Sequence, residues 1–338
     1  MLGALERPGQ APSAALQRFP VPSNSMAVNP AGDHLYFSLP SVVPPIGNSV
    51  LPFDVATGSF ESPVWVGSEP DLAAVSADGQ HLHVALDGGK SIVRLSLPGL
   101  KPEEQFQIAS ADGKLMDACF LLSLPASPAS VIADPCFGSD LDQSFGVAMY
   151  DDGVPRPQRT TSYVGRTGSP TQGPLVDEAQ LSDDGTVLYG EQGEFDGSQL
   201  SRWLITPQSL QFDSAGTSFG YQLYLDLACQ HSLCLTGSGY IADTNTLQFV
   251  RQQLGDFAND GLALMDLDNN RMFLLVYYGA DAHIQCYDAT TYKLSGEYVI
   301  PQWEFANSFK KIIGDRLAIA NGEGLILLPI SLLQPPPG

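Results

Sequence analysis

Acidic and amide side chains recur just ahead of repeated apolar runs, and their oxygen atoms are the groups in this sequence best suited to bind an ion. Seven of them fall at similar places in successive copies of a repeat: Asn24, Asp71, Asp117, Asp177, Glu178, Asp260 and Asn307. Ca²⁺ and Mg²⁺ prefer such oxygen ligands, so a ring of these side chains could hold one of these ions through Asp71, Asp117 and Asp177. Asp and Asn also accept hydrogen bonds from backbone N–H groups in turns, and we favour that structural role.

Aromatic and histidine side chains offer a second kind of chemistry. Tyr278 lies close to a predicted rim loop together with His283, and its ring could stack on a sugar or a peptide. Packing between sheets is the alternative that we favour. His81 and His83 share one face of a predicted strand, but no third ligand follows at a readable spacing, so we do not expect zinc there. His34 and His81 take equivalent repeat positions beside a turn, which indicates a structural role.

Motifs of known enzymes are not found. Gly237-Ser238-Gly239 comes nearest to a nucleophile elbow and is typical of a hairpin turn. No glycine-rich phosphate loop precedes a helical pattern. The stretch from Asp266 to Asn270 begins like a calcium loop, but Arg271 stands where that loop needs glycine and Tyr277 where it needs glutamate. These observations favour a protein that binds rather than catalyses.

The elements that must position these residues are short strands. From Asp71 to Leu97 an apolar run, a turn at Asp78-Gly79, an alternating run, a second glycine turn and a third apolar run follow one another. Alternation at a period of two between such turns predicts antiparallel strands with one buried face. A sheet of this size cannot close a core alone, and the pattern recurs along the chain.

The recurrence predicts an all-β protein, a seven-bladed β-propeller of four-stranded antiparallel blades. The last copy, Asn307 to Ile330, supplies three strands, and Leu16 to Val21 at the other end of the chain can donate the missing outer strand. Such pairing would close the ring and remove its open edges. In a propeller, the loops leading into the inner strands and those joining the second and third strands form one rim, where ligands usually bind.

Particular turn sequences carry a resemblance to a family. The turns SADG, SDDG and NPAG, followed by LHV, LYG and LYF, and the segments Asp54 to Gly58 (DVATG) and Asp288 to Tyr292 (DATTY) resemble the YVTN/WD40-like propellers of bacterial secreted and surface proteins. The resemblance covers Leu16 to Leu328. It implies a propeller fold, and it leaves function open because those propellers include binding modules, adhesion modules and a few lactonases.

The composition of the chain argues against some classes of binding partner. The 338 residues are 43% hydrophobic and 16% charged, with 16 basic and 37 acidic side chains and a formal charge of −21. Such a surface repels phosphate backbones and anionic lipids, which argues against nucleic acid and membrane partners, and no apolar run is long enough for a membrane span. Five acidic residues in loops predicted to reach the rim add to its charge: Asp140, Asp142, Glu191, Glu194 and Asp196.

The spacing of the five cysteines bears on whether the protein works in an oxidising compartment. Cys119 and Cys136 sit symmetrically about a turn, as do Cys229 and Cys234, so hairpins would place each pair face to face. The alternatives are two disulfides or small buried apolar residues. If the bridges form, Cys286 stays free and buried, and the compartment is oxidising.

We therefore expect a linker at 1–15, a single propeller domain at 16–333 and a Pro-rich linker at 334–338. The favoured function is a non-catalytic, extracytoplasmic interaction module, secreted or at the cell surface as part of a larger protein. It would be monomeric and present an acidic rim to a protein, peptide or glycan. The rival is a metal-dependent, lactonase-type hydrolase that uses the rim carboxylates, and a structural spacer without a ligand is the third alternative.

Overall fold

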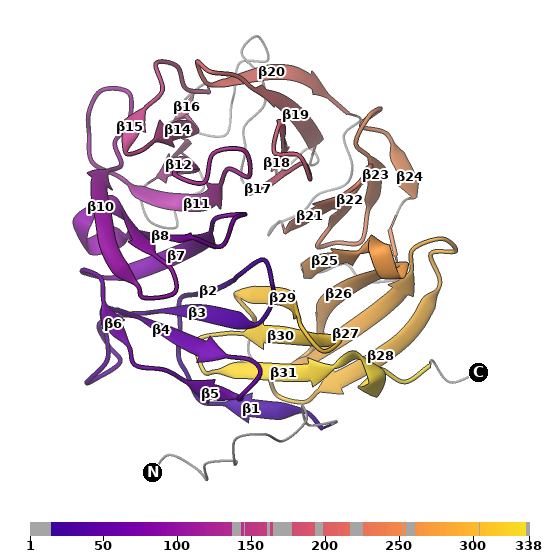
Figure 1. Cartoon of the computed structure of the whole chain (residues 1–338). Coiled ribbons are helices and arrows are strands. Elements are labelled where there is room, and N and C mark those ends of the chain that lie inside the picture. The colour runs from indigo at the N-terminus through magenta and orange to yellow at the C-terminus, as the bar shows by residue number, and fades with distance from the viewer. Residues whose placement is uncertain are drawn as a thin grey trace.

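The chain folds as a ring of blades. The computed structural model describes residues 15–136, 143–144, 146–160, 163–164, 178–192, 199–216, 226–251, 253–254, 261–303 and 305–335. Within these residues, seven antiparallel sheets surround a central axis (Figure 1). Helical structure in the same ranges is limited to three short 3-10 turns: η1 (Asp87–Gly89), η2 (Leu267–Asn269) and η3 (Ile330–Leu332). The prediction of an all-β, seven-bladed propeller is confirmed.

Each blade has four strands, ordered from the inner to the outer strand. The first four blades are β2 (Ser25–Val28), β3 (His34–Leu39), β4 (Ser49–Asp54) and β5 (Ser59–Phe60); β7 (Pro70–Val75), β8 (His81–Leu86), β9 (Ser91–Ser96) and β10 (Lys101–Gln107); β11 (Asp117–Ser123), β12 (Ser130–Cys136), β14 (Ala148–Asp151) and β15 (Val154–Pro155); β17 (Glu178–Leu181), β18 (Val187–Gln192), β19 (Gln199–Ile205) and β20 (Leu210–Ala215).

The remaining blades follow the same order. They are β21 (Leu227–Gln230), β22 (Leu233–Thr236), β23 (Ile241–Asp243) and β24 (Phe249–Arg251); β25 (Leu262–Asp266), β26 (Arg271–Tyr278), β27 (Asp281–Asp288) and β28 (Leu294–Ile300); β29 (Ser308–Ile312), β30 (Arg316–Ala320), β31 (Leu325–Pro329) and β1 (Gln17–Phe19). Two short additions lie outside this pattern: β6 (Val64–Trp65) pairs with β4, and β13 (Gln143–Ser144) pairs with β16 (Tyr163–Val164).

The two ends of the chain meet in the seventh blade. Strand β1 pairs antiparallel with β31, so that Gln17 lies opposite Leu327 and Phe19 opposite Leu325. The ring of Phe19 packs edge-on against Phe53 of the first blade, with centroids 4.9 Å apart. The predicted donor strand therefore closes the ring and also fixes the last blade against the first.

The SADG-type turns form because each supplies its own hydrogen bonds. Ser76 Oγ donates to Asp78 Oδ1 at 2.6 Å, and the backbone N–H of Gly79 donates to the Ser76 carbonyl at 2.9 Å. Gly79 has a φ of +69°, a conformation that side chains with a Cβ rarely adopt. The turn sets the register in which the inner strand meets the second strand.

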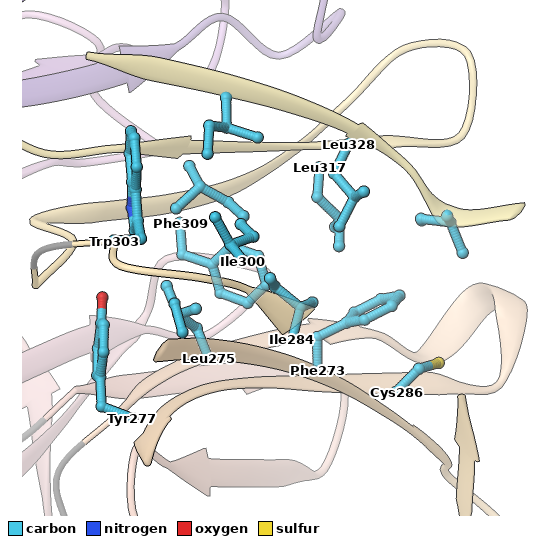
Figure 2. Packing of buried hydrophobic residues seen from close by; sticks show 14 residues of the cluster. Phe273, Leu275, Tyr277, Ile284, Cys286, Ile300, Trp303, Phe309, Leu317 and Leu328 are labelled. Carbon is cyan, nitrogen blue, oxygen red and sulfur yellow. The ribbon is translucent and has the colours of Figure 1, made fainter. Parts of the chain in front are cut away.

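The core lies between neighbouring blades. Figure 2 shows the cluster shared by the sixth and seventh blades, in which Phe273 and Ile284 face Phe309, Leu317 and Leu328. These five side chains are buried. Each face of a blade is covered by the neighbouring blade on that side. Each blade therefore depends on both neighbours for burial of its apolar surface.

Both predicted disulfides are present. Cys119–Cys136 joins β11 to β12, Cys229–Cys234 joins β21 to β22, and Cys286 is a buried free thiol. The bridges support an oxidising, extracytoplasmic environment. Among the residues that the structure describes, no helix is long and apolar enough to cross a membrane.

The linker assignments stay predictions. Residues 1–14 and 336–338 lie outside the described ranges. At the C-terminal end, Gln334 exchanges two backbone hydrogen bonds with Glu297 of β28, at 2.8 and 2.9 Å. The first residue of the predicted Pro-rich segment thus contacts the sixth blade.

The closing strand can be tested through Phe19. We expect Phe19→Ala to lower the free energy of unfolding by about 1 to 2 kcal/mol, because the ring is half-buried against the first blade. Urea denaturation measures the change. Gln17→Ala is the matched control on the same strand and should stay within about 0.5 kcal/mol of wild type. Equal effects of the two variants would mean that Phe19 does not hold the closure together.

The two disulfides should differ in their contribution because the loops that they close differ in length. Replacing Cys119 and Cys136 by Ser should cost about 3 kcal/mol, and replacing Cys229 and Cys234 about 2 kcal/mol, on a chain-entropy model. Urea denaturation of the two double variants measures which of them loses more free energy of unfolding. Thiol titration of the unfolded, unreduced chain should find one reactive thiol, and five would contradict both bridges.

Candidate functional site

The residues at the start of the inner strands form hydrogen bonds to the next blade. Asn24 Nδ2 donates to the carbonyl of Pro70 at 3.0 Å. Asn307 Nδ2 donates to the carbonyl of Ser23 at 2.9 Å. Two residues of the predicted ring therefore connect neighbouring blades through hydrogen bonds from their side-chain amides.

Asp226 occupies the same repeat position ahead of an inner strand, and it is not among the seven residues predicted for this position. It directly precedes β21 and accepts a hydrogen bond from the backbone N–H of Ala263 in the next blade, at 2.6 Å. Burial raises the pKa of its carboxyl group. The fifth repeat has the weakest sequence pattern, and alignment on its cysteine hairpin would have placed Asp226 at this position.

Several predicted site residues lie outside the part of the chain that the structure describes. Asp177 and Asp260 lie outside the described residues, as do four acidic residues of the predicted rim loops: Asp140, Asp142, Glu194 and Asp196. Glu178 begins β17 and Glu191 lies in β18, but their side chains are not among those described. Of the proposed ion ligands, Asp71 and Asp117 are therefore the two that the structure positions.

Asp71 and Asp117 belong to a group of charged residues between the second and third blades, here called the rim cluster: Asp71, Asp87, Lys90 and Asp117. Asp71 lies in β7, Asp117 begins β11, and Asp87 begins η1, which joins β8 to β9. Lys90 Nζ forms an ion pair with Asp117 Oδ1. The loop after the second strand thus brings Asp87 to the rim where the inner strands begin.

Backbone contacts hold Asp87 in this place. Its N–H donates to the carbonyl of Glu69 at 2.9 Å, and the N–H of Gly88 donates to the carbonyl of Ser68 at 3.2 Å. A Cβ atom at position 88 would collide with the Ser68 side chain, so the close approach requires glycine. The sequence predicted a turn at Gly88-Gly89 but gave no sign that the preceding carboxylate faces Asp71 and Asp117.

Carboxyl groups outnumber basic groups in the rim cluster. Burial, together with the negative charges of Asp71 and Asp117, raises the pKa of Asp87 to about 7. Burial and the charge of Asp117 also raise the pKa of Asp71. The buried Oδ1 atom of Asp87 has no hydrogen-bond partner among the described residues. The cluster therefore holds three carboxyl groups with Lys90 as their basic neighbour and has an unused acceptor.

The three carboxyl groups do not form a compact metal site. Within the described part of the chain, one set of three His, Cys, Asp or Glu residues brings its ligand atoms within 4.8 Å of one another, and that set is His34, Asp54 and Glu61 in the first blade. A metal ion held by Asp71 and Asp117 would need a further ligand from residues that are not described.

Aromatic side chains gather at the same rim over the sixth and seventh blades. Tyr278 and His283 meet edge-on with ring centroids 4.6 Å apart, and Tyr278 is 42% exposed. Phe305 is 74% exposed, and its ring lies 4.4 Å from that of Tyr277. Figure 2 shows Tyr277 and Trp303 at one end of the packed cluster. The predicted neighbours Tyr278 and His283 are thus in contact.

Comparison with known proteins identifies the fold and nothing finer. No family model matches the chain, and no curated protein matches it. Hydrazine synthase from Kuenenia stuttgartiensis is similar in structure, with a TM-score of 0.67 and 15% identity over 92% of this chain and 96% of that chain. The resemblance to the YVTN/WD40-like family stays a prediction.

A second solved structure agrees with the first. Dihydro-heme d1 dehydrogenase NirN, in complex with DHE, has a TM-score of 0.59 and 13% identity over 93% of this chain. The match covers 65% of that protein, so this chain spans just under two thirds of its length. Identities this low show a shared β-propeller architecture and do not transfer an activity.

The charge of Asp87 gives a prediction about pH. A carboxyl whose pKa is raised in the folded protein stabilises the fold at low pH and loses that contribution as the pH rises through about 7. Asp87→Asn should therefore raise the free energy of unfolding at pH 8, by about 1 to 2 kcal/mol after allowance for solvent screening.

Urea denaturation at pH 5 and pH 8 measures this effect as a difference between variants. The loss of stability between the two pH values should be smaller in Asp87→Asn than in wild type. Glu323→Gln is the control, because Glu323 is exposed in the corresponding loop of the seventh blade. An unchanged pH dependence in Asp87→Asn would show that Asp87 is not a strained carboxylate.

Proposed function

We propose that this propeller is a non-catalytic interaction module that binds a basic protein or peptide at its rim, in an oxidising compartment. The supporting observation is Asp87: its carboxyl group is partly buried beside Asp71 and Asp117, and its Oδ1 atom lacks a hydrogen-bond partner among the described residues. A lysine ammonium or arginine guanidinium of a partner at the rim would supply the missing positive charge.

Charge supports this choice of partner. With all three carboxyl groups ionised, the rim cluster carries two more negative than positive charges, since Lys90 is its basic member. The whole chain has a formal charge of −21, so a basic partner would be attracted over a distance and encounter the propeller faster at low salt. Binding would also favour the ionised form of Asp87 and lower its pKa again.

The aromatic side chains provide a second contact surface for the same partner. Tyr278 and Phe305 expose large apolar areas at the rim, 42% and 74% of their full exposure. Tyrosine and phenylalanine at such positions contribute strongly to protein interfaces. A peptide that places a basic residue at Asp87 and an apolar residue near Tyr278 would use both surfaces across the channel mouth.

The hydrolase remains the second candidate because of the same carboxyl group. A pKa of about 7 suits a general acid or base, and Asp71 is a neighbouring carboxylate that could take the complementary role. A metal-dependent, lactonase-type reaction would in addition need an ion held by residues beyond Asp71 and Asp117. The two candidates differ in a simple outcome, since a binding module turns over no lactone.

Calorimetric titration with tetralysine and tetraarginine peptides tests the proposal. We expect saturable binding at pH 8 that weakens with salt, and a loss of affinity of about tenfold or more in Asp87→Asn and in Asp117→Asn, because each removes a charged hydrogen-bond acceptor. Glu323→Gln removes one charge from the same rim outside the rim cluster and should bind as wild type does.

Three results would count against it. Equal weakening by Glu323→Gln would show that the peptides respond to overall charge. Unchanged affinity in Asp87→Asn would remove the rim cluster as the site. Turnover of a lactone that a chelator abolishes and that Asp87→Asn removes would favour the hydrolase.

A further inference from the structure

A second group of polar residues lies in the first blade, at the end opposite the rim cluster. His34 begins β3, its strand partner Asp54 ends β4, and Glu61 follows β5. These strands are adjacent in the sheet of the first blade (Figure 1). One ligand atom from each of the three residues lies within 4.8 Å of the others. His34 Nε2 and Glu61 Oε1 are 3.8 Å apart, which is too long for a hydrogen bond.

The imidazole of His34 is already oriented by another carboxylate. Its Nδ1 atom lies 2.9 Å from Asp33 Oδ1, and Asn29 Nδ2 donates to the same oxygen at 2.7 Å. An N–H at Nδ1 that donates to Asp33 leaves the lone pair on Nε2, the atom that faces Glu61. A carboxylate behind a histidine in this way is the usual support of a metal-bound imidazole.

The carboxylate of Asp54 is held in place as well. Its Oδ1 atom accepts hydrogen bonds from the backbone N–H groups of Ala56 and Thr57, at 2.7 and 3.0 Å. No described hydrogen bond uses Oδ2. The turn therefore fixes the carboxylate and leaves one oxygen available beside His34.

Two other blades already contain a cation at or near this place. In the second blade His81 replaces His34, and Nε of Arg94, which lies on the neighbouring strand opposite His83, donates to the carboxylate of Glu103 at 3.0 Å. In the sixth blade the position itself is Arg271, which pairs with Asp266 and Asp315. In the first blade, by contrast, no Lys or Arg among the described residues forms an ion pair with Asp54 or Glu61.

We infer that His34, Asp54 and Glu61 bind a divalent transition metal ion such as Zn²⁺, with Asp33 as the residue that positions His34. One imidazole and two carboxylates suit Zn²⁺, whose ligand atoms in a tetrahedral site lie about 3.4 Å apart. The separation of 3.8 Å between His34 Nε2 and Glu61 Oε1 closes to this value with a small side-chain rotation. His34 and Glu61 are 32% and 48% exposed, so an ion can reach them from solvent, and water completes its coordination.

Titration of the purified chain with ZnCl₂, followed by calorimetry, tests this site. We expect one saturable site in wild type and its loss in His34→Gln and in Glu61→Gln. Asp33→Asn should weaken binding by about tenfold, since supporting carboxylates contribute that much to metal affinity. Co²⁺ in place of zinc should give visible absorption bands in wild type that disappear in His34→Gln.

Two histidine variants serve as controls. His81→Gln changes the equivalent position of the second blade. His231→Gln removes the histidine that lies between Asp183 and Asp268, at 3.0 and 3.1 Å, in another set of the same ligand types. Both should bind zinc as wild type does. The inference is overturned if wild type shows no saturable zinc binding, if His34→Gln binds as well as wild type, or if a control variant loses the site. Circular dichroism of each variant confirms that the propeller is folded.

Discussion

The structure depends on the circle of blades being closed by hydrogen bonds between the two ends of the chain. At the outer edge, β1 pairs with β31. At the inner edge, Asn307 donates to the carbonyl of Ser23, and the N–H of Met26 donates to Ser308 Oγ at 3.1 Å. An open ring would expose the inner faces of the first and seventh blades and leave a free strand edge. Closure also places the starts of all inner strands around one channel, which creates the rim.

The rim cluster differs from the other residues at the starts of the inner strands, which have a structural role. Asn24, Asn307 and Asp226 each form a hydrogen bond to the next blade. Asp71 and Asp117 stand at the same level, but Asp117 pairs with Lys90, and both lie close to Asp87. Because the pKa of Asp87 is raised beside Asp71 and Asp117, ionisation of its carboxyl group near neutral pH lowers the stability of the fold. Such a local cost is typical of functional sites.

The sequence predicted the fold well because each blade repeats local signals: a serine–aspartate–glycine turn, alternation at a period of two, and cysteines placed symmetrically about a hairpin. It did not indicate the two proposed sites, because each brings together residues that are far apart in the sequence or in different strands. Asp87 was missed because the pKa of its carboxyl group is raised by burial and by the charges of Asp71 and Asp117, and Asp117 belongs to the next blade. His34 has the sequence position of a structural residue, and only the fold places Glu61 beside it.

Much of the acidic charge is used within the fold, and this decides how the remaining carboxylates are interpreted. Asp243 accepts hydrogen bonds from the backbone N–H groups of Thr246 and Asn245, which lower the pKa of its carboxyl group. Asp288 does the same with Thr291 and Thr290. These hydrogen bonds stabilise the fold at neutral pH, and by themselves they do not indicate a ligand. Asp87 differs from these turn residues, because its Oδ1 atom has no hydrogen-bond donor among the described residues and its carboxyl group lies near those of Asp71 and Asp117. This difference is the basis of the binding site that we propose at the rim.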